Sequence, residues 1–308
     1  MERMFARIGR IASRQHGVVS RGQVVECGLT AEMIERLIRD GRWVRVYRGV
    51  YRINGAPDTW PSRMMAVCLA AGRGAAISHR SAAALWGLDG FEPRRPIHVT
   101  VPAHRRPRVP GAVVHRSTDL ELAKVTTRQG IPVTGLARTV LDVAATERNP
   151  QVALRALDSV RRRPHHLPWR HLWQCPLFHA RRGRPGISRF RALLERRDGS
   201  EPTDVDFEAL VLDLLIDAGL RAPTPRHWVV RYRLDLAYIP WKIGIECKSK
   251  GWHLNDQAFE EDAIRENSLQ LQGWIIIQVT WARLRDNPAA VVAEVREALA
   301  RRQALTAA

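Results

Sequence analysis

The feature that most constrains the fold is a pair of apolar segments joined by a short turn, RYRLDLAYI (231–239) and KIGIECKSK (242–250). Their composition and the IPW turn between them predict two neighbouring strands. Three of the four lysines in the chain, Lys242, Lys248 and Lys250, lie in the second segment, although nearly all other basic residues are arginines. A lysine is therefore expected to be required there.

The segments around this strand pair predict an α/β domain over 201–308. A helix is expected at 204–219, a second within 253–273, a buried strand at WIIIQVTW (274–281), and a last helix that opens at Pro288,. We expect a mixed sheet flanked by helices.

Residues two apart on a strand share a face, so Glu246 and Lys248 point together, and the turn lets Asp235 approach Glu246,. Glu208, on the first helix of the domain, can supply a further carboxylate. Such oxygen ligands suit Mg²⁺ or Mn²⁺, which lowers the pKa of a bound water, while a lysine stabilises charge on a phosphate. The alternative is a set of solvated charges on an edge strand, but the flanking segments look buried, where unpaired carboxylates are expensive.

Asp235, ten intervening residues and Glu246-x-Lys248 resemble the PD-(D/E)xK nuclease superfamily. The later helix, with Asp262 and Arg265, and the strand after Gly273 are similar to its very-short-patch repair endonuclease branch. The resemblance implies a metal-dependent phosphodiester hydrolase, with Asp235, Glu246 and Glu208 as metal ligands and Lys248 as a catalytic residue.

Three further residues are expected close to this site. The resemblance implies that His253 carries a proton, although a lone histidine near a strand end is more often structural. Asp262 and Arg265 are expected to form a local ion pair that braces the site. Leu234 stands where the motif often has proline, and ECKSKGWH departs from the acidic residue and glycine that often follow the glutamate.

Residues 1–54 predict a winged helix-turn-helix DNA-binding domain. A helix is expected at 5–15, a second in SRGQVVECG (20–28) with Ser20 as its N-cap, and a third after Thr30 that ends at Gly41,. WVRVYRGVYRI (43–53) then alternates apolar and basic residues around Gly49, as a hairpin would.

The expected partner of this domain is duplex DNA. The third helix would enter the major groove with Arg36 and Arg39, and the hairpin would place Arg45, Arg48 and Arg52 on phosphates,. The alternative is a small helical cap with a solvated charged face.

The middle unit, 55–150, is expected to be α/β, with helices at 61–71 and in the Ser78-capped SHRSAAALWGL, and strands at 97–102 and 112–117. With GIPVTGLARTVLDVAA (130–145) and the winged helix, these segments resemble the AbiEi-type antitoxin family. That resemblance implies a repressor that binds promoter DNA and has a toxin encoded nearby. Ser78, His79 and Asp142 are interpreted as cap and helix-face residues, not as a catalytic triad.

Residues 151–200 are basic and rich in proline, and predict a linker between domains. A metal site is not predicted there, because Pro164, Pro168 and Pro176 should break the helix that would align its ligands. The histidines and cysteine concerned are His165, His166, His171, Cys175 and His179.

The net charge of +18 favours a polyanionic partner, and the basic excess lies before residue 200,. Four cysteines without a CxxC pair, and the lack of a long apolar run, favour a cytoplasmic protein that does not enter a membrane,.

Two functions remain open. One is a DNA endonuclease, and the other is an antitoxin-type repressor whose nuclease fold is catalytically silent.

Overall fold

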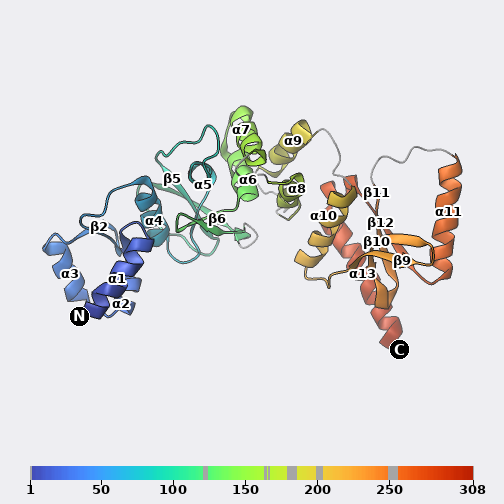
Figure 1. Cartoon of the computed structure of the whole chain (residues 1–308), viewed down its shortest axis with the longest axis horizontal. Helices are drawn as coiled ribbons and strands as arrows, with labels where there is room; N and C mark the ends of the chain where they lie inside the picture. Colours follow the sequence, from blue (N-terminus) through green and yellow to red (C-terminus); the bar gives the residue numbers. More distant parts are fainter. Residues whose placement is uncertain are drawn as a thin grey trace. The chain divides into compact units, whose positions relative to one another are not determined.

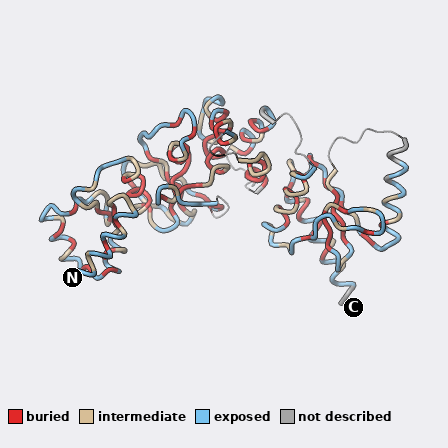
Figure 2. The backbone as a smooth tube through the Cα atoms, viewed as in Figure 1, coloured by how far each residue is buried: buried red, intermediate tan, exposed pale blue. Residues whose placement is uncertain are grey.

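The computed structural model describes residues 2–120, 124–162, 165, 167–178, 186–198, 204–248 and 256–307. The chain divides into two compact units, Met1–Leu167 and Pro168–Ala308. Buried positions concentrate in the sheets and in the helix faces packed on them (Figure 2). No helix in the described ranges is both long and apolar enough to cross a membrane.

Unit 1 begins with the expected winged helix-turn-helix (Figure 1). Its elements are α1 (Glu2–Arg14), β1 (Val18–Ser20), α2 (Arg21–Glu26), α3 (Ala31–Arg39), β2 (Trp43–Tyr47) and β3 (Val50–Ile53). Ser20 forms a capping box with Gln23, and Thr30 accepts a hydrogen bond from the amide of Met33, so both helix starts lie as predicted,. The hairpin is also confirmed, but it gains a third strand, β1, in the order β1-β3-β2.

The rest of unit 1 carries a five-stranded sheet in the order β6-β5-β4-β8-β7. Its elements are α4 (Trp60–Ala71), β4 (Ala76–Ile77), α5 (His79–Trp86), β5 (Ile97–Pro102), β6 (Ala112–Ser117), β7 (Thr126–Arg128), β8 (Ile131–Val133), α6 (Leu136–Thr146) and α7 (Pro150–Arg161). β5 runs parallel to β6 and antiparallel to β4. The winged helix has its own core around Ile34 and Tyr51, while its Val18 and Val50 pack into the core of the five-stranded sheet with Met64 and Val99.

Unit 2 has a four-stranded sheet in the order β12-β11-β10-β9. The sequence predicts a mixed sheet here, and the structure has one. Its elements are α8 (Trp169–Phe178), α9 (Ile187–Asp198), α10 (Asp204–Asp217), β9 (Thr224–Val229), β10 (Tyr232–Tyr238), the 3-10 turn η2 (Ile239–Trp241), β11 (Ile243–Lys248), α11 (Asp256–Leu271), β12 (Ile275–Thr280), α12 (Trp281–Asp286) and α13 (Pro288–Ala307). β10 pairs antiparallel with β11, and β11 pairs parallel with β12. The strand β9 and the short helix α12 were not expected.

Much of the described part of 151–200 is helical. Within unit 2, α8 packs on α12 through Trp173, whose ring contacts the ring of Trp281 edge to face. Pro176 lies inside α8, so the prediction that it breaks this helix is wrong. A proline near a helix end removes one backbone hydrogen bond, and the buried face of α8 compensates for that loss,.

Candidate functional sites

The strand pair of unit 2 brings the predicted carboxylates toward one another. Leu236 on β10 is paired with Ile245 on β11, so Asp235 and Glu246 are the next residues on the two strands. The carboxylate of Asp235 accepts a hydrogen bond of 2.8 Å from the backbone amide of Cys247, the residue between Glu246 and Lys248. The expected convergence of Asp235 with the Glu-x-Lys segment is therefore present.

Glu246 is almost completely buried, with 5% of its surface exposed. Its Oε2 lies 3.7 Å from the ammonium of Lys248, and its Oε1 accepts a hydrogen bond from the guanidinium of Arg265 on α11. Arg265 also donates to the backbone carbonyl of Arg233 at 3.0 Å. Two cations thus compensate this buried carboxylate, which would otherwise be strongly destabilising.

Arg265 braces the site through Glu246. Asp262 was expected to pair with Arg265, but its side chain lies outside the described residues. His253 lies outside them entirely.

Glu208 lies on α10. Burial, followed by the negative charge of Asp235, raises the pKa of Glu208, while Arg226 at 3.6 Å opposes this effect. Burial also raises the pKa of the Cys247 thiol, and the charges of Asp235, Glu208 and Glu246 act in the same direction. The charges of all three predicted carboxylates thus act on the Cys247 thiol.

The donor set fits a hard divalent cation, because Mg²⁺ usually takes one or two protein carboxylates and completes its shell with water and phosphate oxygens. Asp235 and Glu246 supply two carboxylates, with Glu208 near them. Among the described residues, no three of the carboxylates form a compact ligand group. The space beside Glu246, Lys248 and Arg265 is about 20 Å³, enough for roughly one water,.

The arginines predicted to bind DNA lie on α3 and on the β2–β3 hairpin. Arg36 lies 3.6 Å from Asp40, and Arg45 lies 2.6 Å from Glu35, both in exposed pairs. Arg52 is half-buried and pairs with Asp58 at 2.6 Å. Arg39 and Arg48 are exposed. Exposed ion pairs contribute about 0–1 kcal/mol, so those of Arg36 and Arg45 are weak enough to exchange for phosphate.

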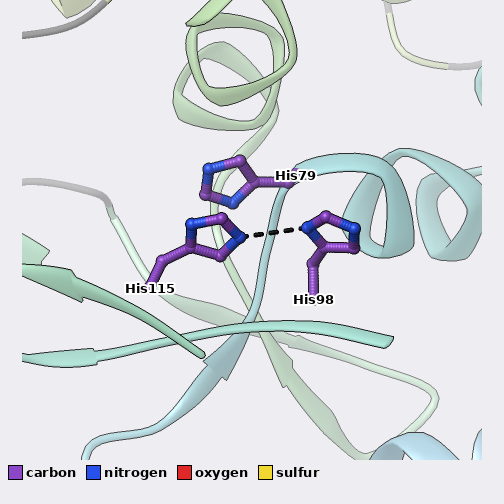
Figure 3. Close-up of side chains that lie close together, drawn as sticks. All are labelled: His79, His98 and His115. Atoms are coloured by element: carbon purple, nitrogen blue, oxygen red, sulfur yellow. Dashed lines mark hydrogen bonds between the residues drawn. The ribbon is translucent and has the colours of Figure 1, made fainter. Parts of the chain in front are cut away.

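A second polar cluster, in unit 1, was missed at the sequence level. His79 at the start of α5, His98 on β5 and His115 on β6 point toward one another (Figure 3). The rings of His79 and His115 stack with centroids 3.6 Å apart, and Nδ1 of His98 lies 3.0 Å from Nε2 of His115. One potential ligand atom from each residue lies within 4.8 Å of the others.

The His79 ring is held by residues from two other elements. Its Nδ1 lies 2.9 Å from the hydroxyl of Ser78 and 3.9 Å from a carboxylate oxygen of Asp142 on α6. Ser78 stands at the N-cap position of α5 but makes no side-chain cap bond there, so its expected capping role is wrong. Its hydroxyl bonds His79 instead and accepts a 2.7 Å hydrogen bond from Thr100. Ser78 and Asp142 approach the same ring nitrogen, which is not the geometry of a Ser-His-Asp relay.

Behind Asp142 lies a buried ionic network. The guanidinium of Arg138 donates to Asp142 at 2.7 Å and to Asp119 at 3.4 Å. All three side chains are nearly inaccessible to solvent. Such networks hold their members in one arrangement when every charge is compensated.

Burial also determines the charge of the other two rings. It lowers the pKa of His115 to about 3, with the neighbouring histidines acting in the same direction. Burial, followed by the charge of Arg80, lowers the pKa of His98. Both rings are therefore neutral near pH 7, and each has one ring nitrogen without a proton.

Two family models match this chain. Residues 7–54 match the model described as "Transcriptional regulator, AbiEi antitoxin", and residues 207–299 match REase_MTES_1575, a restriction-endonuclease-like family. The predicted resemblances at the two ends of the chain are thus confirmed.

Similar proteins include the uncharacterized proteins MT2308 and Rv2248, from two strains of Mycobacterium tuberculosis. Each is 29% identical over 281 residues, which cover 89% of this chain and 98% of the relative. A solved structure, the RV2827C protein of Mycobacterium tuberculosis, aligns at 17% identity with a TM-score of 0.34, over 66% of this chain and 84% of that one.

Proposed function

We propose that this chain binds duplex DNA through its winged helix-turn-helix and hydrolyses phosphodiester bonds with the restriction-endonuclease-like site of unit 2. The observation that carries the proposal is the position of the Asp235 carboxylate on the amide between Glu246 and Lys248. A fold that kept only a binding role would not need two carboxylates and a lysine at one buried strand end.

Asp235 and Glu246, with Glu208 beside them, would hold Mg²⁺ or Mn²⁺. When bound, such an ion polarises the phosphate and lowers the pKa of a coordinated water. Lys248 would stabilise the negative charge that develops on the phosphate in the transition state. In the absence of metal, Arg265 compensates the charge of Glu246 through its hydrogen bond to Oε1, and a bound metal would take its place there.

The winged helix would supply affinity for DNA. In the geometry common to this class, α3 enters the major groove with Arg36 and Arg39, and the hairpin lies along the backbone with Arg45, Arg48 and Arg52 near phosphates. Contacts of this kind release counterions, so affinity should fall steeply with salt.

A second candidate function is an antitoxin-type repressor of its own operon, with a toxin encoded by a neighbouring gene. The match of residues 7–54 to a transcriptional-regulator model favours it. In that case unit 2 would keep the nuclease fold and bind without cutting.

The test is incubation of the full chain with supercoiled plasmid in Mg²⁺, Mn²⁺ or chelator. Wild type should nick the plasmid only with metal. Asp235→Asn, Glu246→Gln and Lys248→Ala should each reduce the rate at least about 100-fold, because each removes a metal ligand or the cation at the phosphate. Duplex binding in a gel shift should remain.

Glu294→Gln is the matched control, since it removes a carboxylate of the same unit that pairs with Arg283 at the surface. It should cut as wild type does. Cleavage by the three site variants at the wild-type rate would show that the site is wrong. Binding without cleavage by wild type in either metal would favour the repressor.

A further inference from the structure

The histidine cluster of unit 1 lies outside the proposed nuclease site and plays no part in it. We propose that His79, His98 and His115 bind one divalent transition-metal ion of the zinc class.

The geometry needs only small side-chain adjustments. One potential ligand atom from each residue already lies within 4.8 Å of the others. Two nitrogens bound to the same zinc ion at its usual distances are at most about 4.2 Å apart. Ring rotations about the side-chain torsions would cover the difference, with no movement of β5 or β6.

The donor chemistry selects the class of metal. Imidazole nitrogens suit Zn²⁺, Co²⁺, Ni²⁺ and Cu²⁺, whereas Mg²⁺ takes oxygen ligands and holds its waters tightly. The cluster and the carboxylates of unit 2 should therefore bind different metals.

The protein holds the cluster as metal sites are commonly held. Ligating histidines are usually oriented by a carboxylate or hydroxyl at the other ring nitrogen, and His79 has both Ser78 and Asp142 near its Nδ1,. His79 also has a left-handed backbone, with φ of 53°. Non-glycine residues adopt that conformation when the surrounding structure imposes it, which is most frequent at functional sites.

An adjoining cavity gives the site a route to solvent. It measures about 390 Å³ and is lined by His98 together with Arg94, Arg95 and the ion pair of Arg80 with Glu147. Of the three histidines, His98 lines this cavity, so a metal held by its ring would have a position open to water or an exchangeable ligand, as catalytic zinc sites do,. Arg94 and Arg95 outweigh Glu92 in charge and favour an anion as that ligand,.

The experiment uses the full chain, stripped with chelator and titrated with Co²⁺, then with Zn²⁺. One equivalent of Co²⁺ should give the intense visible bands of a four-coordinate ion, and Zn²⁺ should displace it. His98→Gln and His115→Gln should each weaken binding at least about 100-fold, as expected for loss of a ligand.

Three control variants should bind as wild type does. His104→Gln changes an exposed histidine of unit 1, and His171→Gln changes a half-buried histidine on α8. The double variant Asp235→Asn, Glu246→Gln removes two carboxylates of unit 2. The double variant also separates this proposal from the nuclease proposal, because it should lose cleavage and keep zinc.

A measurement on wild type alone covers the case in which a cluster variant fails to fold. Zn²⁺ should protect the half-buried His98 and His115 from diethyl pyrocarbonate and leave the exposed His104 reactive, as read by peptide mass spectrometry. Failure of wild type to bind either metal, binding that survives both cluster variants, or equal reactivity of the cluster with and without zinc would overturn the proposal and leave the cluster as a buried polar core.

Discussion

The two polar sites of this protein differ in how the chain assembles them. Asp235, Glu246 and Lys248 lie on two adjacent strands joined by η2, so one turn brings them together. His79, His98 and His115 come from the start of a helix and from two parallel strands, and the sheet order β6-β5-β4 brings them together. Local spacing therefore reveals a site on one strand hairpin, but not a site that depends on strand order.

The sites also differ in how charge is compensated. In unit 2, the buried Glu246 is balanced by Lys248 and Arg265 within the site itself. In unit 1, two of the rings that form the cluster are neutral, and the buried charges lie one layer behind, on Arg138, Asp119 and Asp142. The same kind of substitution should therefore have different effects in the two units.

The largest expected effect comes from replacing the buried arginine of each site by methionine. Arg138→Met leaves Asp119 and Asp142 buried without their cation and should destabilise unit 1 by about 3–5 kcal/mol. Arg265→Met should destabilise unit 2 by roughly 1–2 kcal/mol, because Lys248 still compensates Glu246. Hydrogen exchange read on peptides from each unit measures the two free energies separately.

Arg162→Met provides the control, because Arg162 forms an exposed pair with Asp89 and should contribute about 0–1 kcal/mol,. Equal losses of unfolding free energy for Arg138→Met and Arg265→Met would show that buried charge is compensated in the same way at the two sites.

The second expected effect is that the stabilities of the two units respond to pH in opposite directions. The folded pKa of His115 is about 3, below its ordinary value of 6.5, so the unfolded chain takes up the proton first as pH falls. Unit 1 should lose stability from about pH 6.5 downward, by about 1–2 kcal/mol between pH 7 and 5 after allowance for partial exposure. His115→Phe should reduce this loss.

Glu208 should act in the other direction in unit 2. Its pKa is raised above 4.5, so its contribution to stability is present below pH 4.5 and is lost as pH rises through the folded value,. Glu208→Gln should stabilise unit 2 at pH 7 by less than about 1 kcal/mol and have no such effect at pH 4. Urea denaturation across this range, followed by hydrogen exchange in each unit, checks both signs. If both units gained or lost stability in the same direction of pH, the pKa shifts assigned to His115 and Glu208 would be wrong.

The smallest effect concerns competition between Arg265 and metal for Glu246. Arg265→Met frees one carboxylate oxygen and should tighten Mn²⁺ binding by unit 2 several-fold, since the metal no longer displaces a cation,. Zinc binding by unit 1 should not change, which serves as the internal control. Weaker Mn²⁺ binding would indicate that Arg265 positions Glu246 for the metal and does not compete with it.

Several features could be predicted from the sequence because they depend on neighbours in the chain. Ser20 and Thr30 cap α2 and α3, and Gly49 permits the tight turn between β2 and β3 with φ of 72°,. Period-two spacing placed Glu246 and Lys248 together, and the structure confirms that they form a pair. Each of these features needs only a few adjacent residues.

Features that depend on distant residues required the tertiary structure. β1 and β9 are short or mostly exposed strands whose apolar pattern is weak, and pairing with β3 and β10 defines them. Pro176 is accommodated because Trp173 and the other buried residues of α8 pack on unit 2. Arg265 turns to Glu246 because the chain brings α11 back over the β10–β11 pair.

The sequence by itself determined the winged helix, the mixed sheet of unit 2 and the residues of its carboxylate–lysine site, because helix caps, turns and strand periodicity act over short distances. Only the tertiary structure decided that three isolated histidines in SHRSAAALWGL, IHVTVP and AVVHRS meet, and that Asp142 and Arg138 support them. The physical reason is that strand order and parallel pairing are set by burial of the whole sheet, and no segment encodes that order alone.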